Sequence, residues 1–374
     1  MKLRADRATL LRALGHIQSV AEKRNTIPIL ANVLIAVRDG RLSFTATDME
    51  IAVVEDVAAT STRDGSTTAP AATIFDIVRK LPDGAEVEFD HPGGDAPLAL
   101  RAGRFATSLL VLPVEDFPSM TAGQLPHRFH LPALTLRALI DRTRFAISTE
   151  ETRYYLNGIY LHAVDVDGHR RLRAVATDGH RLARVEEDLP EGAGAMPGII
   201  IPRKTVAELR KLLDEASGSV EVALSDTRIQ FTVGPITLTS KLIDGTFPEY
   251  DRVIPRENDK ILRVGKKDFA EAVARVAAIS SERSRPVKLA LQKDLLTLSA
   301  ASPDQGSATE ELDGDRVQYS AGALEIGFQA RYLNDITDQI SEQVEFRFAD
   351  GSAPTIVCDA ADGTALYVLM PMRV

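Results

Sequence analysis

The sequence lacks the features that mark disulfide-rich, secreted or membrane-spanning proteins. Its 374 residues include one cysteine, Cys358, which excludes a disulfide framework and a metal site built from several cysteines. No apolar run approaches the length of a membrane span. The N-terminal Met1-Lys2-Leu3-Arg4 also lacks the apolar core of a signal peptide. We therefore expect a soluble protein of the cytoplasm.

Signatures of catalysis are missing as well. The sequence has no phosphate-binding loop, no two-histidine helix motif and no nucleophile elbow. Asp48, Asp178, His180 and Asp359 could be metal ligands or an acid–base set. Asp48 and Asp178, however, occupy matching turns, where an aspartate usually accepts hydrogen bonds from nearby amides. We expect structural turns, no metal, no cofactor and no catalysis. A metal-dependent hydrolase is the first alternative.

The chain also lacks the positive net charge that is typical of nucleic-acid-binding proteins, since its formal net charge is −9. The charge is unevenly distributed, because most stretches with helical periodicity carry more basic than acidic residues. If these helices share one surface, that surface attracts phosphate while the outside repels it. Otherwise the basic residues simply line solvated helix faces.

What the sequence does contain is an internal repeat. Ala176-Thr177-Asp178 repeats Ala46-Thr47-Asp48 after 130 residues, between apolar runs in both places. Phe247-Pro248 repeats Phe117-Pro118 at the same offset. A fainter third copy opens with Asp268-Phe269. Self-similarity at a fixed period indicates a chain of related structural units.

The repeat predicts three domains, at residues 1–125, 126–258 and 259–374. Each has two stretches of helical periodicity and several alternating stretches that are typical of strands. The helical stretches are residues 7–20, 74–81, 137–148, 202–216, 266–279 and 330–340. We predict an α+β fold of three repeated domains, each with two helices plus antiparallel sheets.

Two further stretches each allow two interpretations. Arg153-Tyr154-Tyr155 is either the start of a strand or a basic, aromatic loop that stacks on nucleic acid. Residues 368–374 are apolar almost to the end of the chain, which indicates a buried final strand. The methionines on both sides of Pro371 would also suit an adaptable pocket wall for several different peptides.

Together these motifs resemble the bacterial sliding-clamp family, the beta subunits of DNA polymerase III, over the whole chain. The most specific motifs are Thr26-Ile27-Pro28-Ile29-Leu30, Arg153-Tyr154-Tyr155-Leu156-Asn157-Gly158, Thr177-Asp178-Gly179-His180-Arg181-Leu182, Ser240-Lys241-Leu242, Phe247-Pro248 and Met370-Pro371-Met372-Arg373. The resemblance implies a head-to-tail homodimer whose six domains form a ring, with helices around the hole and sheets at the rim. It implies a non-catalytic protein that encircles duplex DNA, whatever its sequence, and confers processivity on the replicative polymerase.

The resemblance also implies a peptide-binding pocket between the second and third domains. Carried over by motif, its residues are Leu156, Thr177, Gly179, His180, Arg181, Leu182, Pro248, Arg252, Val253, Val368, Leu369, Met370, Pro371, Met372 and Arg373. Tyr332 is expected to gate this pocket. The expected partners are the polymerase alpha subunit, the clamp loader, translesion polymerases and mismatch-repair proteins, each binding through a short linear motif.

Contacts with DNA and between subunits are expected at further positions. The resemblance and the basic helices together place DNA contacts at Arg24, Arg137, Arg142, Arg144, Tyr154, Tyr155, Arg203 and Lys204. In the dimer, the resemblance sets Thr107 and Leu109 of one subunit against Ala278 and Ile279 of the other. The second alternative function is a β-rich scaffold without a role at nucleic acid.

Overall fold

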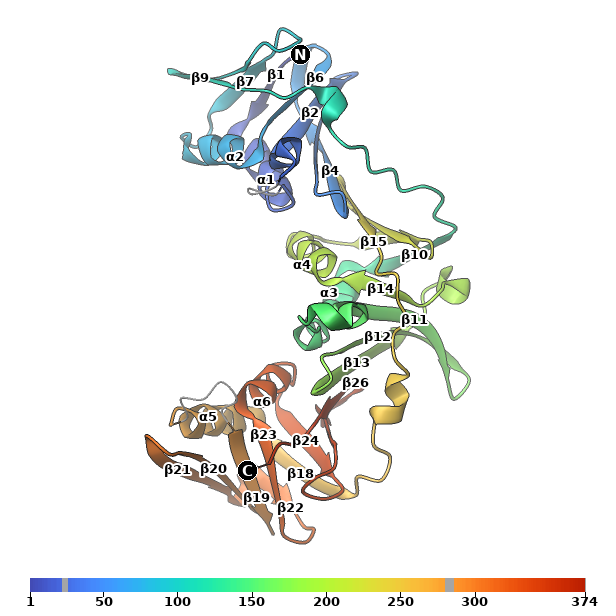
Figure 1. Ribbon diagram of the computed structural model, residues 1–374, viewed down its shortest axis with the longest axis vertical. Coiled ribbons are helices and arrows are strands. Elements are labelled where there is room, and N and C mark those ends of the chain that lie inside the picture. Colours follow the sequence, from blue (N-terminus) through green and yellow to red (C-terminus); the bar gives the residue numbers. More distant parts are fainter. Residues whose placement is uncertain (22–25, 280–285, 374) are drawn as a thin grey trace. The chain divides into compact units, whose positions relative to one another are not determined.

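A computed structural model describes residues 1–21, 26–279 and 286–373 (Figure 1). The chain forms two compact units. The first contains Met1–Arg137, Pro190–Pro197 and Lys204–Leu242, and the second contains Ala138–Leu189, Gly198–Arg203 and Ile243–Val374. None of the described helices is long and apolar enough to cross a membrane.

The first unit is built on two antiparallel sheets. The larger has the strand order β10 (His127–Pro132), β15 (Ser219–Leu224), β16 (Arg228–Val233), β17 (Ile236–Lys241), β4 (Ile51–Ala58), β3 (Arg41–Thr47), β2 (Asn32–Arg38) and β6 (Gly65–Pro70). The smaller has the order β5 (Thr60–Arg63), β1 (Lys2–Asp6), β7 (Glu86–Asp90), β8 (Leu98–Ala102) and β9 (Phe105–Leu109). Helices α1 (Arg7–Ile17) and α2 (Ala71–Lys80) lie side by side (Figure 1).

The second unit has the same kind of construction. Its larger sheet has the order β14 (Ile199–Pro202), β11 (Gly158–Val166), β12 (His169–Thr177), β13 (Arg181–Asp188), β26 (Asp362–Leu369), β25 (Thr355–Asp359), β24 (Gln343–Phe348), β18 (Lys260–Gly265) and β22 (Val317–Tyr319). The smaller has the order β21 (Gly306–Asp313), β20 (Leu295–Ser302), β19 (Pro286–Gln292) and β23 (Leu324–Gln329). Helices α5 (Lys266–Ala277) and α6 (Ala330–Thr337) pack against each other.

The helices form where hydrophobic periodicity predicts them. In α1, Leu10, Leu14 and Ile17 fall on one face and are buried. The side chain of Asp6 caps its first turn by accepting a hydrogen bond of 2.9 Å from the amide of Thr9. Helix α4 (Arg203–Leu212) likewise begins directly after a proline that ends β14.

The helix expected over residues 137–148 is the one prediction that differs appreciably. Helix α3 runs from Ala133 to Asp141 and is followed by the short 3-10 helix η3 (Arg144–Ala146). Thr143 ends α3, because its buried hydroxyl donates to the carbonyl of Leu139 at 2.6 Å and its backbone leaves helical geometry. Arg142 and Arg144 therefore follow the helix and do not line it.

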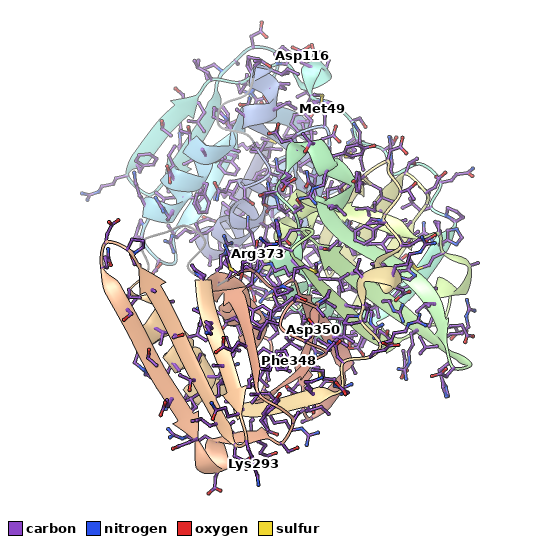
Figure 2. All side chains as sticks on the ribbon, turned by 60° about the horizontal axis from the view of Figure 1, so that its bottom comes forward. Met49, Asp116, Lys293, Phe348, Asp350 and Arg373 are labelled. Atoms are coloured by element: carbon purple, nitrogen blue, oxygen red, sulfur yellow. The ribbon has the colours of Figure 1, made fainter. Side chains whose placement is uncertain are left out.

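The two ambiguous stretches are also resolved. Residues 153–155 do not start a strand, because they lie in the 3-10 helix η4 (Glu151–Leu156) before β11. The final strand β26 ends at Leu369, and the chain continues extended as far as a bridge between Met372 and Gly327 of β23. Figure 2 shows Arg373 near one end of the smaller sheet, away from the β19–β20 turn that carries Lys293.

The repeated Thr-Asp turns have the structural role expected of them. One carboxylate oxygen of Asp178 accepts hydrogen bonds from the amides of His180 and Arg181, at 2.9 and 3.0 Å. Asp48 makes the same two bonds in the β3–β4 turn, at 2.8 Å each. In the part of the chain that the structure describes, no group of three or more His, Cys, Asp or Glu side chains could hold a metal ion.

The same strand pairing follows both turns. Strand β4 pairs with β17, and β13 pairs with β26. At the end of the first pair the amide of Lys241 donates to the carbonyl of Glu50 at 2.9 Å, and at the end of the second the amide of Met370 donates to the carbonyl of His180 at 2.9 Å. We call these two places the first and second strand junctions.

Candidate functional site

A cavity of about 300 Å³ opens at the second strand junction. Its wall is formed by the end of β12 with the following turn, the ends of β13 and β26, the 3-10 helix η4, and the 3-10 helix η6 (Tyr250–Val253). A second cavity of about 260 Å³ shares Met370 with it. Both cavities lie entirely within the second unit.

Most residues predicted for the pocket line one of these cavities. The larger cavity is lined by Leu156, Thr177, Gly179, Arg181, Leu182, Pro248, Val253, Val368 and Met370. The smaller is lined by His180, Tyr332, Met370, Pro371 and Met372. Arg252, Leu369 and Arg373 line neither. Leu369 is 0 % exposed, and in the sheet it pairs with Arg181 on one side and Thr355 on the other.

The structure adds residues that sequence reasoning did not assign to the pocket. The larger cavity is also lined by Arg153, Tyr155, Glu249 and Tyr250, and the smaller by Gln329. Tyr155, which was predicted to contact DNA, forms part of the cavity wall, and its neighbour Tyr154 is 53 % exposed. The position of Tyr250, two residues after Pro248 of the repeated Phe-Pro motif, was the one available signal.

The floor of the larger cavity is apolar. Leu156, Leu182 and Val368 are almost fully buried and belong to one hydrophobic cluster with Phe247 and Tyr250. At its edge, Val253 and Met370 are exposed. Burying a large apolar side chain on such a surface is worth about 1.5–3 kcal/mol. The cavity is therefore suited to apolar side chains of a partner.

Arg181 has a structural role in the wall. Its guanidinium pairs with Asp178 at 3.1 Å and with Asp335 of α6 at 2.5 Å, and it donates to the carbonyl of Phe145 at 2.5 Å. It also lies 4.4 Å from the centroid of the Tyr332 ring, a cation–π distance. Arg181 therefore fixes α6 and Tyr332 beside the strand junction.

Gly179 lies in close contact with the side chain of Arg153. It has a φ of +89°, and a Cβ atom there would lie 2.5 Å from a guanidinium nitrogen of Arg153. Arg153 is held over the glycine by Glu150 at 2.7 Å and by the carbonyl of Asp178 at 3.1 Å. The cavity wall thus carries two held cations, Arg153 and Arg181, beside its apolar floor.

The residues predicted to contact DNA differ in their surroundings. Arg137 pairs with Asp214, Arg142 with Asp362, Arg144 with Asp141 and Lys204 with Asp48. Arg203 and Tyr154 are exposed, and Arg24 lies outside the described residues. Arg142 is largely buried and also donates to Thr364 at 2.9 Å, so it ties the end of α3 to β26.

The residues predicted for the dimer contact lie at the margins of two sheets. Strand β9, which carries Thr107 and Leu109, is the last strand of its sheet. Leu109 points into the core of its own unit, while Leu110 is 81 % exposed. Ala278 and Ile279 follow α5, which packs against β20 and the edge strand β21.

A buried ion pair in the first unit gives a pH-dependent prediction. Nδ1 of His16 lies 2.9 Å from the buried carboxylate of Glu55, and Nε2 lies 3.6 Å from Glu215. The hydrogen bond to Glu55 raises the pKa of His16, although burial opposes it. A raised histidine pKa stabilises the folded state fully below the unfolded pKa of about 6.5, and the gain is lost as the pH rises through the folded value.

We therefore expect His16→Gln to lower the melting temperature by about 2–4 °C at pH 5.5, and by less at pH 9. Calorimetric melting across this range measures the difference. The matched control is His169→Gln, because His169 is exposed at the start of β12. An equal loss of stability at both pH values would contradict an ionic role for His16.

Models of three protein domains match successive parts of the chain. They are described as the N-terminal, central and C-terminal domains of the DNA polymerase III beta subunit, and they match residues 1–121, 130–249 and 251–373. The beta sliding clamp of Caulobacter vibrioides is 52% identical over 375 residues, which cover 100% of both chains. The beta sliding clamp of Escherichia coli is 39% identical over 379 residues, again with 100% of both covered.

Solved structures agree with these matches. A crystal structure of the Caulobacter crescentus beta sliding clamp has a TM-score of 0.97 at 52% identity, and covers 100% of this chain and 99% of that one. A sliding clamp from Bartonella birtlesii bound to griselimycin has a TM-score of 0.96 at 46% identity, with 100% of both chains covered. A sliding clamp from Pseudomonas aeruginosa, also bound to griselimycin, has a TM-score of 0.94 at 38% identity with the same coverage.

Proposed function

The chain belongs to the family of bacterial DNA polymerase III beta subunits, the beta sliding clamps, and on that premise we propose how it performs this role. A sliding clamp is a non-catalytic subunit that confers processivity in DNA replication. We propose that two copies of this chain close head to tail into a ring around duplex DNA in the cytoplasm. Its three domains would be residues 1–125, 126–258 and 259–374.

The free edge of β9 supports this dimer. Its outer side has no partner strand among the described residues, and the exposed Phe105 and Leu110 flank it. An open strand edge presents backbone groups with which another strand can pair, and exposed apolar side chains beside it favour an interface there. In a head-to-tail dimer, β9 of one subunit would meet the region of α5 and β21 of the other, where Ala278 and Ile279 lie.

The pattern of paired cations supports sliding rather than tight binding. Four predicted DNA contacts already have carboxylate partners, and among the described residues of the predicted set Arg144, Arg203 and Tyr154 are exposed. Each phosphate neutralised by a protein cation adds salt-dependent affinity. A ring that holds DNA topologically needs few such contacts and moves more freely without them.

The observation that carries the proposed partner binding is the apolar cavity at the second strand junction. It takes large apolar side chains on Leu182 and Val368, and its exposed edge residue Met370 can adapt to different ones. We propose that short linear motifs of the polymerase alpha subunit, the clamp loader, translesion polymerases and mismatch-repair proteins bind there in turn. Griselimycin, which is bound to two related clamps, would occupy the same cavity.

Retention on circular DNA tests the ring. The protein is loaded by a clamp loader onto a nicked circular plasmid, separated from free protein on a sizing column, and analysed again after the plasmid is cut once. A clamp stays on the circle, resists moderate salt and is lost from the cut DNA. Retention on both DNAs that falls steeply with salt would indicate ordinary electrostatic binding and would contradict the ring.

A further inference from the structure

Tyr250 is a wall residue whose hydroxyl is held from behind the cavity. The side chain is 6 % exposed and begins η6, the segment that also brings Val253 into the cavity wall. Its hydroxyl lies 2.7 Å from Nη1 of Arg173 and 2.9 Å from Nε2 of His162. Arg173 and His162 do not line the cavity. The hydroxyl therefore joins η6 to the two strands β12 and β11 beneath it.

The hydrogen bonds of this group form one consistent chain. Nδ1 of His162 lies 3.3 Å from the carbonyl oxygen of Ala163, which can only accept, so Nδ1 carries the proton. Nε2 of His162 then accepts from the Tyr250 hydroxyl, whose oxygen accepts in turn from Arg173. Burial lowers the pKa of His162, so its ring is neutral at neutral pH. Each polar atom along the chain has one defined role.

Arg173 is fixed independently of Tyr250. It is 5 % exposed, and its other terminal nitrogen lies 2.7 Å from Glu186 on the neighbouring strand β13. Its guanidinium centre is 5.8 Å from the centroid of the Tyr250 ring. A buried arginine is costly to desolvate and is retained where its partners hold it well. Arg173 is therefore a rigid support, and Tyr250 rests on it.

Aromatic packing fixes the remaining directions of η6. The Tyr160 ring stacks on His162 at 4.5 Å and on Phe247 at 4.9 Å, and it meets the Tyr250 ring edge-on at 6.4 Å. These contacts limit sideways movement of Tyr250. They leave its depth in the wall to the hydroxyl, which Arg173 and His162 hold, and to the ion pair of Arg173 with Asp251 of η6 at 3.6 Å.

We propose that Arg173 is a positioning residue for the peptide-binding cavity, which it serves through the Tyr250 hydroxyl by holding the η6 wall in place. The inference rests on the proposed peptide binding. Without Arg173 the hydroxyl loses its donor, Tyr250 can shift, and Val253 moves with it. Binding of a partner must then also order the η6 wall, and the entropic cost of this ordering weakens binding.

A double-mutant cycle measured with griselimycin as the probe tests this role. Calorimetric titration of the full chain gives the dissociation constants of the parent protein, Arg173→Met, Tyr250→Phe and the double variant. We expect Arg173→Met to weaken binding about tenfold, and the double variant to bind no more weakly than Arg173→Met alone. Arg173→Lys, which keeps one donor, should recover part of the affinity.

Arg184→Met is the matched control. Arg184 lies in the same charged group, 3.3 Å from Glu186 and 3.9 Å from Asp251. Within the described residues, however, no hydrogen bond joins it to Tyr250. This variant should change the affinity less than about twofold. If Arg184→Met weakens binding as much as Arg173→Met, Arg173 acts only through general stability. The same conclusion follows if the double variant raises the dissociation constant by the product of the two single-variant effects.

Two further variants show whether a negative result disproves the positioning role of Arg173 or the proposed peptide binding. If Arg173→Met does not fold, Tyr250→Phe must weaken binding by itself, because it removes the same hydrogen bond and keeps the ring; unchanged affinity would overturn the inference. Val253→Asp places a charge on the exposed edge of the cavity. If Val253→Asp weakens binding while the Arg173 variants do not, only the positioning role of Arg173 is disproved. If it has no effect, the cavity is not the binding site and both proposals fall.

Discussion

Replacing Leu110 by aspartate should convert the dimer into a monomer of 40.6 kDa. Leu110 directly follows the free edge strand β9 and is 81 % exposed in the single chain, so the proposed interface is the place where it is buried. An unpaired carboxylate buried there costs several kcal/mol, which weakens association about 100-fold or more. Sedimentation at micromolar concentration measures the mass, and the variant should no longer be retained on nicked circular DNA.

Leu134→Asp provides the control for this experiment. Leu134 is 74 % exposed on α3, so the substitution adds the same charge to an equally open leucine away from the strand edge. It should leave the mass of the dimer unchanged. If Leu110→Asp remains dimeric while circular dichroism shows that it is folded, the subunits associate through another surface.

Gly179→Met should abolish detectable binding of griselimycin to the cavity. The new side chain would extend into the cavity, and its Cβ would lie 2.5 Å from the Arg153 guanidinium, which must move. Methionine is a fair test residue, because Met49 takes the matching place in the first Thr-Asp turn, with a φ of +74°. The backbone can therefore be formed, and we expect affinity to fall about 100-fold or more through blocked contacts.

The matched control is Gly168→Met. Gly168 has a φ of +79° in the β11–β12 turn, and a Cβ atom added there meets nothing within 4 Å. Both variants should lose about 1–2 kcal/mol of stability from the left-handed backbone, but the control should bind griselimycin as the parent protein does. Retained binding by folded Gly179→Met would remove this cavity as the site.

The local elements could be predicted from the sequence, because they depend on short-range patterns. The spacing of Leu10, Leu14 and Ile17 specified α1, and the Thr-Asp triplets specified two turns held by their own carboxylates. Strand order could not be predicted. Pairing of β4 with β17 sets Ile51 beside Ser240, and only the packing of whole domains determines such a distant register.

The pocket could be predicted as far as its motifs extend. Motif comparison identified the turn at Gly179 and the tail at Met370, but not Tyr250 or Arg173. Alternation along β12 gives Arg173 a side of the sheet, but it does not reveal that η6 covers that side. The ion pair of Arg142 could not be predicted for a related reason, because only the fold supplies Asp362 as its partner.

The two strand junctions differ in how open they are, and under the proposed peptide binding this difference bears on how many partners a clamp can hold. At the second junction Gly179 and Met370 leave an open cavity, whereas at the first Met49 replaces the glycine and Lys241 forms an ion pair with Glu50 at 2.9 Å. Under the proposed peptide binding, partners would bind at the second junction of each chain and not at the first, although the repeat provides two matching places. A ring of two chains would then have two binding sites, one on each chain. A polymerase and one competitor could bind at the same time, and a third partner could bind only after one of them dissociates.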